Sequence, residues 1–308
     1  MRQKQITAIL TLKDRSIYTK RWFQSNYTNQ IEFIIADSSV SNKNFTFFSK
    51  NVRENITYIR FKPEKNVQEI AKKIYFAIKK VKTRFLFLCD NDDFINLKKI
   101  KYLSSLLKKL NKEVYGYHLK SACEKACRKK NVFKYSYSFQ SGDYKKFQNL
   151  NAKKKLFLNL NSYNHFWYNL FEKKAAIFLW KIIINLKIQN IYALELAQSL
   201  LSISLFKFAH VPICHYVRIS NSRKSVARSL RKSSSVFDDA FFCVKFQNDI
   251  KKLKKYLEEK KICTIDEFNI GFKQFLINQL SLITIILNKI KSIKIKILSQ
   301  LCFKKSVF

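Results

Sequence analysis

The chain has 308 residues and a formal net charge of +39 at pH 7, from 60 basic and 21 acidic residues. That length is enough to bury a full hydrophobic core and to carry an extension. With only three glycines and two prolines, the composition excludes collagen-like and low-complexity chains. The excess charge favours anionic partners, namely nucleic acids, anionic lipid surfaces or phosphorylated small molecules, although a lysine-rich surface can also be only solvated.

The seven cysteines follow no regular spacing. Residues 1–5 lead into a strand-like run that is too short for the apolar region of a signal peptide. We therefore expect reduced thiols and a cytoplasmic location.

The first 90 residues alternate between strand and helix patterns. Residue Ser16 is a plausible N-cap, and Asn66 with Glu69 three positions later has the spacing of a capping box. The expected strands are residues 6–12, 31–36, 56–61 and 85–89, and the expected helices begin at Ser16 and Asn66. This succession predicts an α/β layer sheet.

The second part of the chain has a less regular pattern. We expect helices over residues 96–110, 175–186 and 192–205, strands over 113–119, 164–171 and 211–217, and a loop-rich segment or hairpin over 121–148. Beyond Ser220 the sequence becomes basic and serine-rich, so we predict one domain over residues 1–220 and a basic, largely helical extension over 221–308. The apolar stretch 275–290 falls short of the ~20 residues that a membrane span needs, so we expect an amphipathic or packed helix there.

An acidic cluster follows the most apolar predicted strand. Residues 85–89 are five apolar residues in a row, which is typical of a strand buried on both faces of a mostly parallel sheet. Asp90, Asp92 and Asp93 come next, where an open α/β sheet places its ligand crevice. Carboxylates in this arrangement can share a hard divalent cation with substrate phosphates. The alternative is a solvated turn that starts a helix.

With Asp37-Ser38-Ser39 after the second strand and Asn91-Asp92-Asp93-Phe94 after the fourth, residues 5–220 resemble family-2-type bacterial glycosyltransferases with a GT-A fold. More narrowly, they resemble a subgroup with a DDDF form of the aspartate motif. The resemblance implies a Rossmann-like, mostly parallel central sheet with flanking helices. It leaves the basic helical C-terminal extension outside the matched region.

The resemblance also implies roles for individual residues. Glu195, on the helix before the last predicted strand, would be the catalytic base of an inverting reaction. The implied nucleotide-sugar ligands are Lys13, Arg15, Asp37, Asp90 and Arg218, and the implied ligands of Mn²⁺ or Mg²⁺ are Asp90, Asp92, Asp93 and His215. The acidic pair common in the family is reduced here to Glu195, and the Gln-x-x-Arg-Trp signature of processive synthases is absent from the sequence.

Each of these residues has a simpler interpretation. Asp37 could form only an Asx turn, and Glu195 could be an ordinary carboxylate on a helix surface. The histidines His118, His165 and His210 are expected to be structural. The cluster over residues 166–168 could stack on an acceptor sugar, but core packing is the better expectation for three adjacent aromatic residues.

The sequence thus favours a metal-dependent enzyme that transfers a sugar from a nucleotide-sugar donor to a surface-glycan or lipid-linked acceptor. Alternating lysines and apolar residues over 290–301 favour attachment to an anionic membrane surface, on the inner face of the cell membrane. The alternative is a non-catalytic basic protein that binds membranes or nucleic acid. We expect no specific nucleic acid partner, because the sequence contains no recognisable nucleic-acid-binding module.

Overall fold

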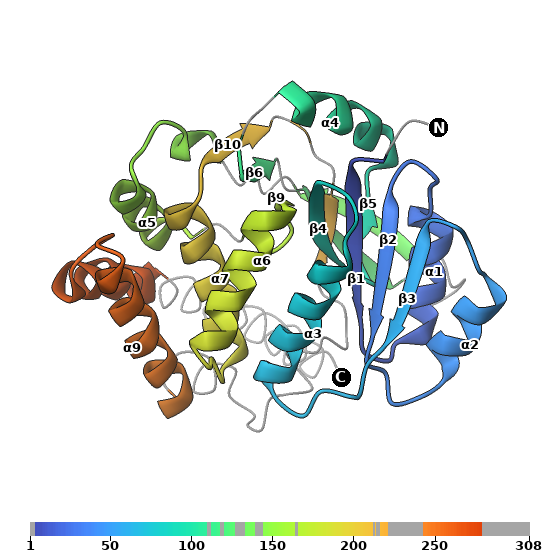
Figure 1. Cartoon of the computed structure of the whole chain (residues 1–308), viewed down its shortest axis with the longest axis horizontal. Coiled ribbons are helices and arrows are strands. Elements are labelled where there is room, and N and C mark those ends of the chain that lie inside the picture. Colours follow the sequence, from blue (N-terminus) through green and yellow to red (C-terminus); the bar gives the residue numbers. More distant parts are fainter. Residues whose placement is uncertain are drawn as a thin grey trace, which may run out of the picture.

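The computed structural model describes residues 4–109, 112–117, 120–126, 133–138, 144–163, 166–211, 213, 216–220 and 243–278. Within these residues the chain forms two sheets with helices packed on the larger one (Figure 1). The larger sheet has the strand order β3-β2-β1-β4-β9-β6-β10. Its strands are β1 (Ile6–Leu12), β2 (Glu32–Asp37), β3 (Ile56–Arg60), β4 (Phe85–Asp90), β6 (Val114–Tyr117), β9 (Leu170–Glu172) and β10 (Phe208–Val211).

The larger sheet is mostly parallel. Strand β1 pairs in parallel with both β2 and β4, β2 with β3, and β10 with β6, whereas β9 runs antiparallel to β4 and β6. Apolar residues fill β4 without alternation because both faces of this strand are covered. The predicted α/β class with a mostly parallel central sheet is therefore confirmed.

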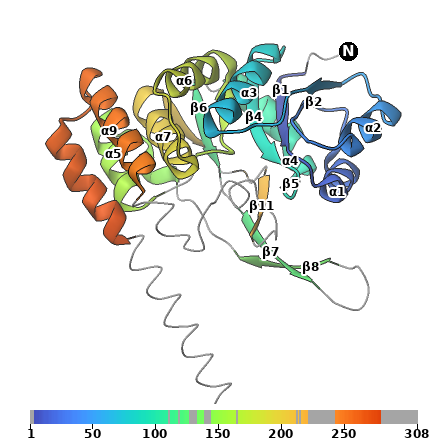
Figure 2. The same ribbon diagram turned by 90° about the horizontal axis from the view of Figure 1, so that it is seen from below.

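Helices cover both faces of the larger sheet. Helices α3, α6 and α7 lie on one face, and α1 and α4 lie on the other, as Figures 1 and 2 together show. The helices are α1 (Ser16–Asn26), α2 (Lys43–Lys50), α3 (Val67–Lys80), α4 (Leu97–Lys109), α5 (Ala152–Asn161), α6 (Lys173–Asn185), α7 (Ile191–Leu205) and α9 (Val244–Glu259). A further helix runs over 265–278.

The smaller sheet begins directly after the acidic cluster. Its order is β5-β11-β7-β8, from β5 (Phe94–Ile95), β11 (Tyr216–Ser220), β7 (Lys120–Ala126) and β8 (Phe133–Ser138). Figure 2 shows this sheet below the larger one, with β7 and β8 extending away from it. The pairing of β11 with β5 thus ties residues 216–217 to the segment that follows the aspartates.

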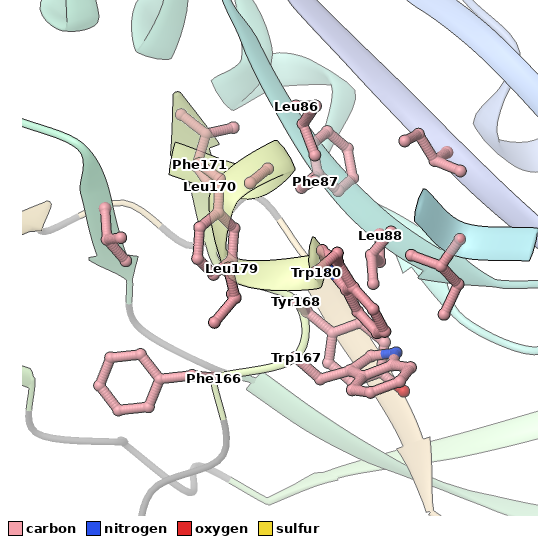
Figure 3. Close-up of a cluster of buried hydrophobic side chains, with 14 of the residues drawn as sticks. Leu86, Phe87, Leu88, Phe166, Trp167, Tyr168, Leu170, Phe171, Leu179 and Trp180 are labelled. Atoms are coloured by element: carbon pink, nitrogen blue, oxygen red, sulfur yellow. The ribbon is translucent and has the colours of Figure 1, made fainter. Parts of the chain in front are cut away.

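A buried aromatic cluster joins β4 to the chain that enters β9. Leu86, Phe87 and Leu88 of β4 lie beside the segment 166–171 (Figure 3). Trp167 packs edge-on against Trp180 of α6, with ring centroids 5.5 Å apart. The aromatic residues at 166–168 are all buried, so they pack in the core as expected.

The structure corrects several predicted boundaries. Among the described residues of the strand predicted over 164–171, only Leu170 and Phe171 lie in a strand, β9, because residues 166–169 form a turn closed by the hydrogen bond from the Asn169 N–H to the Phe166 carbonyl. The single strand predicted over 211–217 is two strands in different sheets, β10 and β11. Pro212 lies between them in the sequence, and a proline cannot donate a hydrogen bond within a sheet. Helices α2 and α5 were not predicted, and Arg15 rather than Ser16 is the N-cap of α1.

Residues 243–278 are largely helical and pack on α5 and α7. Asp249 of α9 is buried, and its Oδ2 accepts hydrogen bonds from the backbone N–H groups of Gln189 and Asn190, at 2.7 and 2.8 Å. Asn190 in turn caps α7. At Gly271, an added Cβ would lie 2.7 Å from a ring carbon of Phe157, so the helix over 265–278 contacts α5 closely. The boundary at residue 220 stays a prediction, and residues 279–308 lie outside the described residues.

None of the helices in the described ranges combines the length and the apolarity that crossing a bilayer requires.

Five residues other than glycine adopt left-handed backbone angles in the described chain, and they are Asp14, Arg15, Asn149, Lys187 and Lys261. Lys187 and Lys261 stand just after α6 and α9, where helices commonly end on a glycine.

We predict that Asp249→Ala lowers the free energy of unfolding by about 2 kcal/mol, because two backbone N–H groups lose their acceptor at a buried position. Urea denaturation measures the change. Asp266→Ala is the control, since this aspartate is exposed on the helix over 265–278. Equal stability of the two variants would contradict the role of Asp249 in joining α9 to α7.

Candidate active site

The predicted ligands after β2 and β4 meet at one edge of the larger sheet. Strand β1 lies between β2 and β4, with Leu12 in register with Asp37 and Thr11 in register with Asp90. After β1 the chain builds β2 and β3 on one side and then crosses to β4 on the other. In open α/β sheets, the carboxyl ends of strands at such a reversal form the ligand crevice.

The acidic cluster brings three carboxylates close together. One oxygen each from Asp90, Asp92 and Asp93 lies within 4.8 Å of the others. Asp92 and Asp93 are buried and Asp90 is half-buried. The structure therefore brings together the three aspartates that the sequence proposed as metal ligands.

Two arginines of α1 and its N-cap hold Asp92. The guanidinium of Arg15 donates to Asp92 Oδ2 at 3.0 Å, and that of Arg21 donates to the Asp92 carbonyl at 3.1 Å. Both guanidinium groups stack on the ring of Tyr18, at 4.4 and 4.9 Å from its centroid. Positive charge is thus fixed beside the acidic cluster.

Hydroxyl groups hold Asp90 and Asp93. Asp90 accepts hydrogen bonds from Thr11 at 3.2 Å and from the Tyr168 hydroxyl at 2.6 Å. The Tyr216 hydroxyl donates to Asp93 Oδ2 at 2.6 Å and accepts from the Asp90 N–H at 3.0 Å. The buried Asn26 side chain adds backbone contacts with Asp93 and Ile95.

This donor set fits a divalent cation. Carboxylate oxygens are the preferred ligands of Mg²⁺ and Mn²⁺, and two carboxylates with water and phosphate oxygens complete such a site. The hydrogen bonds from Thr11 and Tyr168 orient Asp90 in the way that partners of metal-binding carboxylates do. Of the remaining predicted ligands, His215 lies outside the described residues, and only the backbone of Arg218 is described, on β11.

Asp37 is fully buried at the end of β2. Its carboxylate accepts hydrogen bonds from Ser39, from the Tyr58 hydroxyl and from Arg60, whose Nη1 lies 2.9 Å from Oδ2. Burial raises the pKa of Tyr58 well above its ordinary value, and the Asp37 charge adds to this, so Tyr58 stays protonated as a donor. The simple Asx turn is present, through the Ser39 N–H, but Asp37 also anchors two side chains of β3.

The loop after β1 links the two acidic sites. Asp14 donates its N–H to Ser39 Oγ at 2.6 Å, and its carboxylate accepts the N–H groups of Val40 and Ser41. Asp14 and Arg15 both adopt left-handed backbone angles. Such residues cost about 1–3 kcal/mol each and concentrate at functional sites. This turn points Arg15 at Asp92.

A buried charge network lies beneath the same edge. Glu64 pairs with Lys73 and, at 3.6 Å, with Lys13. Lys73 also donates to the Leu12 carbonyl and to Ser38. Burial lowers the pKa of Lys73, although the charge of Glu64 opposes this shift. Burial also acts to raise the pKa of Glu64, but the charge and hydrogen bond of Lys73 and the hydrogen bond from Ser38 outweigh it, so the pKa of Glu64 is lowered. Lys13 is therefore held by Glu64 at the end of β1.

Glu195 lies one turn before Ser199 on α7 and is partly exposed. Ser199 Oγ accepts the Phe166 N–H at 3.1 Å, and Gln198 donates to the Phe166 carbonyl. This face of α7 therefore contacts the turn that carries Tyr168 to Asp90. Glu195 thus lies on the helix that contacts this turn, and its role as the base stays a prediction.

The sequence reasoning missed Tyr216, Glu64, Lys73 and Asn26, and for Tyr168 it weighed core packing and acceptor stacking but no contact with Asp90. No local pattern marks these residues. The one signal that could have identified a residue of this set is a polar residue close after a strand end, as Glu64 is after β3.

Comparisons with known proteins bear on this geometry. No protein-family model matches the chain, and no curated protein matches it. Among solved structures, S. aureus TarS 1–349 in complex with UDP-GlcNAc is similar, with a TM-score of 0.50 and 10% identity over 82% of this chain and 71% of that chain. The chain has the GT-A fold.

Another structure of S. aureus TarS 1–349 matches with a TM-score of 0.45 and 11% identity, over 70% of this chain and 60% of that chain. The chain thus spans about three fifths of the length of that TarS structure. The likeness to the UDP-GlcNAc complex, at 10% identity, is one of fold, and it confirms the GT-A fold that the resemblance implied.

We predict that Glu64→Gln destabilises the protein by about 3–5 kcal/mol, because Lys73 is left buried without its counter-ion. The double variant Glu64→Gln/Lys73→Met should recover most of this loss, since it removes both charges. Urea denaturation of the two single variants and the double variant forms the complete cycle. Additive losses would show that the two charges are not coupled.

The stability that Glu64 contributes depends on pH. Because the pKa of Glu64 in the folded chain is lowered from 4.5, the ionised carboxylate contributes stability above that pH. This contribution is lost as the pH falls through the folded-state pKa, so the acid-induced loss of stability should be smaller in Glu64→Gln.

Proposed function

We propose that this chain is a glycosyltransferase that uses a nucleotide-sugar donor and a divalent cation. The observation that carries the proposal is the cluster of Asp90, Asp92 and Asp93 at the strand-order reversal of a GT-A sheet, with oxygens within 4.8 Å. The TarS structure of the same fold contains UDP-GlcNAc, which supports a uridine-diphosphate sugar as the first donor to test.

Asp90 and Asp92 would hold Mn²⁺ or Mg²⁺, with Asp93 in support and His215 as a further candidate ligand. When bound, such an ion stabilises the negative charge that develops on the departing nucleoside diphosphate. Arg15 lies 3.0 Å from Asp92, so it can contact the same diphosphate. Arg218 is proposed for the diphosphate on the resemblance alone.

Lys13, just after β1, and Asp37, at the end of β2, would bind the nucleoside part of the donor. Asp37 is positioned by Tyr58 and Arg60, and Lys13 is positioned by Glu64. Asp14 connects this region to Arg15. A donor with its base near Asp37 and its diphosphate near Asp92 would follow the carboxyl edge of the sheet.

Glu195 is our candidate for the general base. An acceptor hydroxyl must lose a proton as it attacks the anomeric carbon, and a carboxylate within hydrogen-bond reach can accept it. A single displacement of this kind inverts the anomeric configuration. The contact of α7 with the turn that bears Tyr168 supports the choice.

For the acceptor we propose a surface glycan or a lipid-linked glycan, used at the inner face of the cell membrane. The net charge of +39 supports an anionic surface as a partner. The competing function is a non-catalytic basic protein that binds membranes or nucleic acid. Salt-dependent duplex binding without any affinity for nucleotide sugars would favour that alternative.

We predict that UDP binds in the presence of Mn²⁺ and that Asp92→Asn weakens this binding at least about tenfold, because a metal-binding carboxylate is lost. Isothermal calorimetry with and without Mn²⁺ measures the effect. Asp266→Asn, an exposed aspartate outside the site, should bind as the unmodified chain does. Unchanged affinity in Asp92→Asn would remove the metal role of this residue.

We predict that Glu195→Gln keeps its affinity for UDP and Mn²⁺ but loses turnover by about 10²–10⁴-fold, the usual contribution of a general base. Initial rates of sugar transfer or donor hydrolysis, screened over a panel of nucleotide sugars, give the comparison. Glu259→Gln, an exposed glutamate near the end of α9, is the matched helical control. A fully active Glu195→Gln would exclude this residue as the base.

A further inference from the structure

Two tyrosines from distant parts of the chain meet at the acidic cluster. Tyr168 comes from the turn before β9, and Tyr216 is the first residue of β11. Their rings stack with centroids 4.5 Å apart and an interplanar angle of 20°. Figure 3 shows Tyr168 beside Trp167 in the buried aromatic cluster. This stacking therefore fixes the orientation of both rings and the position of each hydroxyl group.

The two hydroxyls contact different aspartates. Tyr168 donates to Asp90 Oδ2, and Tyr216 donates to Asp93 Oδ2, both at 2.6 Å. Tyr216 also accepts the backbone N–H of Asp90. Tyr216 thus connects the first and last aspartates of the cluster, while Asp92 is held separately by Arg15.

Such contacts matter because three carboxylates in four residues repel one another. A hydroxyl donor stabilises an ionised carboxylate and fixes the direction of its other lone pairs without adding a competing charge.

We propose that Tyr168 and Tyr216 are positioning residues that set the affinity of the aspartate cluster for its cation. The proposal rests on the proposed function, because it takes Asp90, Asp92 and Asp93 as the cation ligands. The tyrosines contact the ligating carboxylates and not the cation. Groups in this position commonly change metal affinity 10–100-fold when removed.

The pair also joins the two sides of the site. The turn that carries Tyr168 packs on α7, which bears Glu195, through the bonds of Ser199 and Gln198 to Phe166. Tyr216 is paired with Ile95, two residues after Asp93. The stack therefore lies between the turn that packs on α7, the helix of the candidate base, and β11, the strand that carries Arg218.

The test uses the full chain and Mn²⁺ alone, without donor. We expect Tyr168→Phe and Tyr216→Phe to bind Mn²⁺ 10–100-fold more weakly, as measured by calorimetry or by the electron paramagnetic resonance signal of free Mn²⁺. Tyr58→Phe is the matched control, because it removes a hydroxyl that donates to the buried Asp37 instead, and its Mn²⁺ affinity should be unchanged.

A second readout separates positioning from loss of structure. The variant for this readout is Tyr168→Phe, because it keeps the contacts of Tyr216 with Asp90 and Asp93. If Tyr168 is a positioning residue, saturating Mn²⁺ restores the UDP affinity of this variant. If the variant is misfolded, UDP affinity stays low at every Mn²⁺ concentration. Mn²⁺ affinity equal to that of the unmodified chain in both folded variants would overturn the proposal and leave the proposed function standing. Failure of the unmodified chain to bind Mn²⁺ and UDP would overturn both.

Discussion

Mutual repulsion of Asp90, Asp92 and Asp93 is the constraint on which the rest of the site depends. Their oxygens lie within 4.8 Å of one another in a region that is largely shielded from water. The chain offsets the repulsion with one charged donor to Asp92 and with hydroxyl donors to Asp90 and Asp93. These donors come from the β1 loop, from the turn before β9 and from β11, so the fold must be complete before the cluster is stable.

Much of the fold could be predicted because its signals are local. Five apolar residues in β4, the capping pattern at Asn66 and the apolar stripe of α3 each report on neighbours within a few residues. The order of these elements then indicates a parallel sheet, whose carboxyl edge gathers Asp37 and Asp90. The acidic cluster and the α/β sheet could thus be anticipated from the residues themselves, whereas the GT-A fold was implied by the family resemblance.

The partners of the aspartates could not be predicted, because they depend on tertiary placement. Tyr216 lies 123 residues beyond Asp93. It was assigned to a single strand over 211–217, whereas the chain changes sheets within that range. Glu64 and Lys73 look like ordinary surface charges in a chain with 60 basic residues. Only the packing of α3 against β1 and β2 buries them together.

The scarcity of glycine has a consequence for protein engineering. Lys187 and Lys261 follow α6 and α9 with left-handed backbone angles, where a side chain is strained and a glycine is not. Both lie far along the chain from the aspartates and from Asp37. These two helix ends therefore offer sites at which thermal tolerance could be raised while the proposed active-site edge of the sheet keeps its sequence.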